Sequence, residues 1–76
     1  MEPERIRIKT DTIKVQQLLK WAGVAQTGGQ AKEMIERGEV SVNGERELHR
    51  GRQLLPGDSV QLADGREFIL VGWGEE

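Results

Sequence analysis

Cysteine is absent from this chain of 76 residues, which excludes disulfides, thiolate metal sites and cysteine nucleophiles. No apolar run approaches the roughly 20 residues of a membrane-spanning helix. The first ten residues are charged and lack the apolar core of a signal peptide. A chain this short buries only about 60% of the surface that its unfolded form exposes, so its core is modest. We therefore expect one cytoplasmic domain, residues 1–76, with no membrane partner.

Excess positive charge is also lacking, since 11 lysines and arginines stand against 13 acids, a formal net charge of -2. This balance argues weakly against nucleic acid as a partner. The charges are unevenly spread, however. The segment from Lys14 to Lys32 contains three lysines, Lys14, Lys20 and Lys32, and no acid. The local field of a basic patch steers an anionic ligand, whereas net charge mainly affects solubility. The net charge therefore does not exclude an anionic partner.

The first part of the chain has the pattern of a strand followed by a helix. Residues 4–11 alternate charged and apolar side chains, the period of a strand with one buried face. Residues 12–22 place apolar side chains on one helical face, with Asp11 and Thr12 as candidate N-caps and Gly23 just past the end. The pattern predicts a short amphipathic helix, Thr12 to Ala22.

A second helix is predicted between Thr27, its N-cap, and the terminating Gly38. Glu33 and Arg37 stand in the favourable i,i+4 order on this helix. Its apolar stripe consists of Ala31, Met34 and Ile35.

The second half of the chain changes to the period of strands. Asn43-Gly44 and Asp64-Gly65 are dipeptides suited to hairpin turns, and Pro56-Gly57-Asp58 marks a further turn. We predict an α+β fold, in which two short helices pack on a small, mainly antiparallel twisted sheet of four to five strands.

Motifs for catalysis are missing. His49 is the only histidine, and no cysteine, nucleophile motif or second histidine accompanies it. The segment "TGGQ", Thr27 to Gln30, could hold a phosphate at a helix N-terminus, but it lacks the Walker lysine and the dinucleotide spacing. Its glycines are equally explained by a sharp turn between helices. We expect a protein that is not an enzyme and has no cofactor or metal.

The two tryptophans carry different expectations. Trp21 lies at the border of the apolar stripe of the first helix, where it can pack at the core margin or stack on a base; the core margin is favoured. Trp73 is expected to close the core beside the last strand.

The strongest signal is the segment from Val42 to Asp58, which concentrates basic side chains after the Asn-Gly turn. The planar fork of arginine suits bidentate contact with phosphate and stacking on bases. Glu45 and Glu47 are credible partners for Arg46, but "HRGR" has no acid after Glu47 until Asp58. We interpret the segment as an anion-binding arm, formed by Arg46, His49, Arg50 and Arg52.

Four motifs, "LLKWAGV", "GGQAKEMIERGEV", "VSVNGE" and "LLPGDSV", follow one another over roughly residues 6–62. In order and spacing they resemble the S4-type RNA-binding domain, in particular the stand-alone bacterial YbcJ/YaaA-like group. The resemblance implies an S4-like fold with its alpha-L motif, and binding to structured RNA, ribosomal or transfer RNA, in ribosome assembly or translation. Separately from the resemblance, we expect a monomer. Ribosomal particles would be a further partner.

The resemblance also implies which residues contact RNA. The positions that match the family motif are Lys14, Thr27, Gln30, Lys32, Arg37, Asn43, Arg46, Arg50 and Arg52. We add Lys20 and His49 because they are basic residues near these positions. Many family members have arginine where this chain has Gly28. The arginines of "HRGR", after the hairpin, would replace that missing positive charge. The alternative from another class is a protein-interaction adaptor, whose arginines meet an acidic partner.

Overall fold

Two sheets and two helices make up the computed structural model, which describes residues 3–73 of the predicted 1–76 domain. The larger sheet has five strands in the order β1-β7-β6-β3-β4, and β2 pairs with β5 in a separate two-stranded sheet. The elements are β1 (Glu4–Ile8), β2 (Ile13–Lys14), α1 (Val15–Trp21), α2 (Gly28–Glu36), β3 (Val40–Val42), β4 (Glu45–Arg46), β5 (Gln53–Leu54), β6 (Ser59–Leu62) and β7 (Glu67–Gly72). The α+β class is confirmed.

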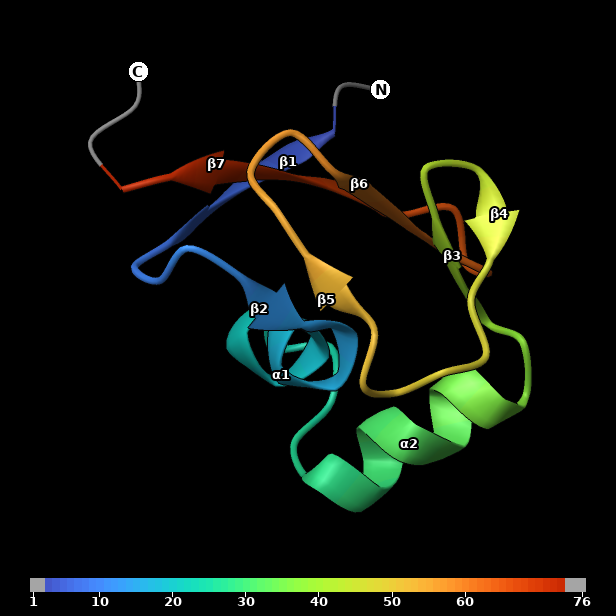
Figure 1. Ribbon diagram of the computed structural model, residues 1–76. Coiled ribbons are helices and arrows are strands. Elements are labelled where there is room, and N and C mark those ends of the chain that lie inside the picture. Colours follow the sequence, from blue (N-terminus) through green and yellow to red (C-terminus); the bar gives the residue numbers. More distant parts are fainter. Residues whose placement is uncertain (1–2, 74–76) are drawn as a thin grey trace.

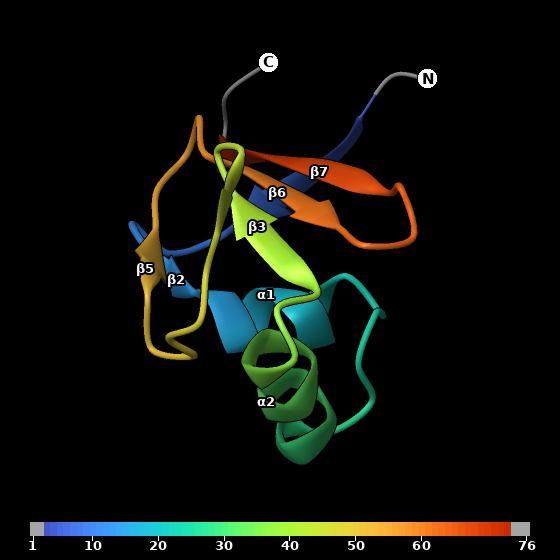
Figure 2. The same ribbon diagram turned by 90° about the vertical axis from the view of Figure 1, so that its right-hand side faces the viewer.

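Both helices lie on the same side of the five-stranded sheet (Figures 1 and 2). The sheet is mixed, because β1 runs parallel to β7 while its other neighbouring pairs are antiparallel. Alternation along β1 turns Ile6 and Ile8 inward and the charged residues outward, as its pattern predicts. The core between sheet and helices consists of Ile6, Ile8, Val15, Leu18, Leu19, Ala25, Ala31, Ile35, Val40, Val42, Leu54, Val60, Leu62, Phe68 and Leu70.

The first helix begins later than the sequence predicts. Residues 13–14 form β2 and pair with residues 53–54 of β5, so the helix starts at Val15 and neither Asp11 nor Thr12 is its N-cap. The pairing partner lies some 40 residues along the chain, which no local capping pattern reveals. The two helices therefore follow the second strand, not the first.

Signals that act within a few residues are confirmed. The Thr27 hydroxyl accepts a hydrogen bond from the Gln30 N–H at 3.1 Å and caps α2. Asn43 and Gly44 have φ angles of 52° and 87°, the left-handed pair that a type I′ hairpin turn requires. The strand predicted after this turn is short, since β4 ends at Arg46.

Trp73 does not close the core. Its side chain is 65% exposed just beyond the end of β7, and the Lys9 ammonium lies 5.4 Å from the centre of its ring. Trp21 is also exposed, by 57%, instead of packing at the core margin. Aliphatic side chains and Phe68 fill the space between sheet and helices, so the core holds neither indole. Among residues 3–73, no helix is long and apolar enough to cross a membrane.

Candidate nucleic-acid interface

All eleven residues predicted to contact RNA are exposed, but only three of them, Lys32, His49 and Arg50, line one common hollow. A subset gathers where α2 faces the loop of residues 47–52. There a hollow of about 520 Å³ is lined by Lys32, Glu36, Leu48, His49, Arg50 and Gly51. We call this surface the α2–loop hollow. It combines cations from two segments that are separated along the chain.

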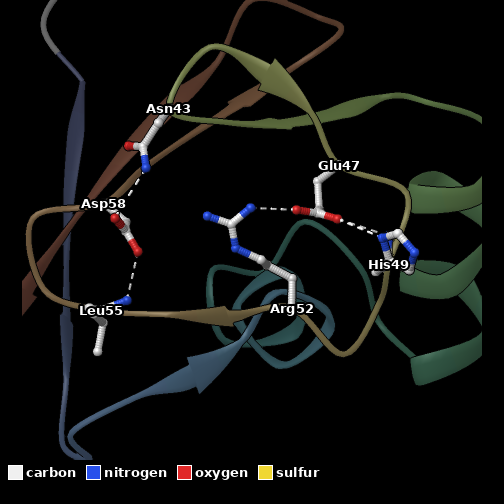
Figure 3. A network of polar contacts seen from close by, with 6 residues as sticks. All are labelled: Asn43, Glu47, His49, Arg52, Leu55 and Asp58. Atoms are coloured by element: carbon white, nitrogen blue, oxygen red, sulfur yellow. Dashed lines mark hydrogen bonds and ion pairs between the residues drawn. The ribbon is translucent and has the colours of Figure 1, made fainter.

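A buried carboxylate shapes the loop. The Glu47 side chain is 9% exposed and its Oε1 accepts a hydrogen bond from the Arg52 guanidinium at 2.7 Å. Its Oε2 accepts one from the His49 backbone N–H at 3.1 Å and lies 3.2 Å from the His49 ring Nδ1 (Figure 3). The sequence led us to expect "HRGR" to lack an acidic partner. Two of its four residues in fact contact Glu47, so the expectation is wrong for His49 and Arg52.

The same contacts set the ionisation of Glu47. Burial alone would raise the pKa of this carboxyl group, because it disfavours the charged form. The hydrogen bonds from the His49 backbone, the Arg52 guanidinium and the His49 ring outweigh burial and hold the pKa below its ordinary value of 4.5. Glu47 is therefore a carboxylate at neutral pH, and it partly neutralises the cations around it.

Acid should destabilise the protein through Glu47. Since folding lowers this pKa, the stabilisation is fully present above the ordinary value of 4.5 and is lost as pH falls through the lower folded value. We expect the free energy of unfolding, measured by urea titration, to fall more steeply below pH 4.5 in the wild type than in Glu47→Gln. Parallel acid profiles of the two proteins would contradict this assignment.

The loop also joins the start of α1. The Val15 N–H donates to the Arg52 carbonyl at 2.9 Å, and the Gln16 N–H donates to the Arg50 carbonyl at 3.4 Å. These amides would otherwise lack partners in the first turn of the helix. The loop backbone is thus fixed to α1, and it presents the side chains of Arg50 and His49 toward α2.

Several other predicted contact residues have structural partners. The Gln30 side chain ties the start of α2 to the preceding residues, because its oxygen accepts a hydrogen bond from the Gln26 N–H at 2.6 Å. Arg37 pairs with Glu33 along α2, as its spacing predicts. The Arg46 side chain crosses Gly38 so closely that a Cβ there would lie 3.0 Å from its Cδ.

Asn43 at the hairpin tip ties two turns together. Its amide nitrogen donates to Asp58 at 3.1 Å, while its oxygen accepts from the Ser59 N–H at 2.9 Å. Asp58 in turn accepts a hydrogen bond from the Leu55 N–H at 2.8 Å (Figure 3). The hydrogen bonds of Asn43 therefore hold the β3–β4 turn against Asp58 and the start of β6.

The remaining predicted residues, Lys14 and Lys20, are not among those that line the α2–loop hollow. Lys14 belongs to β2, and Lys20 lines a different hollow, between α1 and the connection from β1 to β2. Sequence reasoning missed Glu36 and Leu48 as neighbours of the α2–loop hollow. It also missed Glu47 as the residue that shapes the loop. Glu47 was visible only as a nearby acid, and its burial has no local signal.

The described residues offer no cluster of side chains for a metal ion. Among residues 3–73, no group of three histidine, cysteine, aspartate or glutamate side chains could hold a metal ion. The α2–loop hollow does carry two cations, Lys32 and Arg50, beside one acid, Glu36, and such cations suit contact with an anionic surface.

Comparison with known proteins adds two similarities. A family model described as S4 domain matches residues 6–71 of the chain. A protein of Bacillus subtilis (strain 168), named "Probable ribosome maturation protein RlbA", is 42% identical over 66 residues, which cover 87% of this chain and 93% of that protein. The similarity thus extends over nearly the whole of both chains.

Proposed function

Since this chain belongs to the S4 domain family, we propose that it is a non-catalytic protein that binds structured RNA during ribosome maturation. The family membership supports RNA as the ligand, as the sequence motifs imply. The name of the Bacillus relative supports the process, because 42% identity over nearly both full lengths favours a shared role. Such a role needs access to ribosomal particles, so the cytoplasm is the proposed location.

The observation that carries the proposal is the α2–loop hollow. Lys32 and Arg50 lie on its wall, and neither has an ion-pair partner among the described residues. Arg52 is partly committed to Glu47, although 45% of its side chain is exposed. We therefore assign the principal phosphate contacts to Lys32 and Arg50, with His49 beside them.

Contacts of this kind recognise the backbone and shape of RNA more than its sequence. Lysine and arginine bind phosphate oxygens, which are the same at every nucleotide. Paired RNA exposes its phosphates and 2′-hydroxyls, whereas its deep major groove hides most base edges. A rigid loop facing a helix supplies two fixed walls for such a ligand. Whether the RNA is ribosomal or transfer RNA is decided by comparing the two as competitors.

The proposal predicts a salt-dependent affinity that resides in the α2–loop hollow. Lys32→Ala with Arg50→Ala should weaken binding of a labelled, structured ribosomal RNA fragment by about tenfold or more at low salt. The slope of log affinity against log salt should fall by about 2, one for each lost phosphate contact. Fluorescence anisotropy at several salt concentrations measures both quantities.

A matched control removes the same charge elsewhere. Arg5→Ala with Arg66→Ala changes two exposed arginines, one on β1 and one in the turn between β6 and β7. This variant should keep most of the affinity. Equal losses in both double variants would show that net charge, not the hollow, supports binding. Absence of RNA binding by the wild type would remove the proposed function and favour the adaptor, whose protein complex excess RNA should leave intact.

A further inference from the structure

A second hollow lies on the opposite side of α1 from α2. Figure 1 shows the connection between β1 and β2 on one side of α1 and α2 on the other. This hollow has a volume of about 450 Å³, within the range of small-ligand sites. We call it the Trp21 hollow; it is lined by Ile8, Lys9, Thr10, Ile13, Gln17, Lys20 and Trp21.

The lining combines an apolar floor with positive charge. Ile8 and Ile13 contribute aliphatic surface, and Trp21 contributes an indole that is 57% exposed. Lys9 and Lys20 bring two ammonium groups, while none of the seven described residues that line the hollow is acidic. A ligand that suits this site carries a flat apolar ring next to a negative charge.

We propose that the Trp21 hollow binds an unpaired nucleotide of the RNA, with its base stacked on Trp21 and its phosphate held by Lys9 or Lys20. Aromatic side chains are the usual platforms for unpaired bases, and the stacking is tolerant of base identity. Lysine donates to phosphate as a point charge, without demanding one fixed geometry. This inference rests on the proposed function, because it gives the RNA a second contact.

The choice of a nucleotide over a protein side chain follows from the charges. An apolar protein segment would gain nothing from two ammonium groups at the rim, and it would partly desolvate them at a cost. Lys9 also lies 5.4 Å from the Trp73 ring centre, so its ammonium stands between the hollow and a second exposed indole.

The positions of the two hollows relative to α1 indicate which kind of RNA would fill both. The two hollows are lined by different segments, so one RNA that fills both has to extend past α1. A single-stranded extension can bend around α1, since its backbone is flexible. The protein would therefore favour a junction where paired RNA passes into unpaired RNA.

The test compares two labelled RNAs: a blunt hairpin stem, and the same stem with a single-stranded extension of about six nucleotides, at the 5′ or the 3′ end. Anisotropy gives the affinity for each RNA. The extension should raise wild-type affinity by about tenfold, the effect of one or two stacked bases. Trp21→Ala should remove that gain and leave the affinity for the blunt stem unchanged, whereas Trp21→Phe should keep part of it.

A second readout reports on the hollow directly. In a Trp73→Phe background, Trp21 is the only tryptophan, and stacking of a base should quench its fluorescence when the extended RNA is added. Far-UV circular dichroism and thermal unfolding check that each variant is folded. The Lys32→Ala, Arg50→Ala protein should lose affinity for both RNAs and retain the ratio between them.

The outcomes separate this inference from the function on which it rests. Equal wild-type affinities for the two RNAs at both extension ends, or unchanged Trp21 fluorescence, would overturn the Trp21 hollow and leave RNA binding intact. Failure to bind either RNA would overturn both. A gain in affinity that survives in Trp21→Ala would place the unpaired strand elsewhere.

Discussion

Replacing Leu54 by alanine is expected to lower the free energy of unfolding by about 2–5 kcal/mol. Leu54 is fully buried on β5, which pairs with β2. Truncation removes apolar contacts and leaves a cavity that the core fills only in part. The loss should be large because a small domain has a total stability of only about 5–15 kcal/mol. Urea unfolding, followed by circular dichroism, measures the change.

The neighbouring leucine supplies a matched control. Leu55 is 53% exposed, so Leu55→Ala should change stability by no more than about 0.5 kcal/mol. Leu54→Met, a swap of similar volume, should cost less than about 1.5 kcal/mol and keeps the protein measurable if the alanine variant unfolds. Equal losses for Leu54→Ala and Leu55→Ala would contradict the packing described here.

Removing the Glu47 carboxylate is the second large change. Glu47→Ala deletes the acceptor of hydrogen bonds from Arg52 and from the His49 backbone. Hydrogen bonds to charged groups contribute about 1.5–3 kcal/mol, so we expect a loss in that range. The loop should also loosen, because its inner anchor is gone. Hydrogen exchange should then become faster at the Val15 amide, whose acceptor is the Arg52 carbonyl.

Two further variants distinguish the causes. Glu47→Gln retains an oxygen for the His49 N–H but has no charge for Arg52, so its stability should fall between the wild type and Glu47→Ala. Glu45→Ala removes an exposed carboxylate from β4 and should have little effect. A Glu47→Ala protein as stable as the wild type, with unchanged exchange at Val15, would show that the loop is held by its backbone alone.

Local patterns predicted much of this fold. The alternation along β1, the Thr27 cap and the Asn43-Gly44 turn each depend on residues that are close together in the chain, and each is confirmed. The resemblance to the S4 family is confirmed as well, because it rests on the spacing of several such motifs over most of the chain.

Features that depend on distant residues were not predicted. Helix α1 starts later than predicted because residues 13–14 pair with β5. The two tryptophans were expected near the core, but helical and strand periods do not say which apolar face is covered by the rest of the chain. Trp21 and Trp73 are both exposed because aliphatic side chains already fill the space between sheet and helices.

In the candidate site, too, local features were predicted and contacts between distant residues were not. Composition located the basic arm, but it did not tell which cations have partners. Arg52 turns toward Glu47, five residues earlier, only because the loop folds back on α1. Arg50 and Lys32 both line the α2–loop hollow, and no sequence spacing connects them. Contacts between side chains of separate segments follow from the tertiary structure and not from either segment alone.

The parallel pairing of β1 with β7 has a consequence for how the protein is made. Glu4 is aligned with Phe68, so the first of the described strands pairs with the last of them. Contacts between such distant residues slow folding, because a long loop must close before they form. On a translating ribosome, β1 must therefore stay unpaired until β7 has emerged. Its alternating charged residues, Arg5 and Arg7, keep that waiting strand from pairing with other chains.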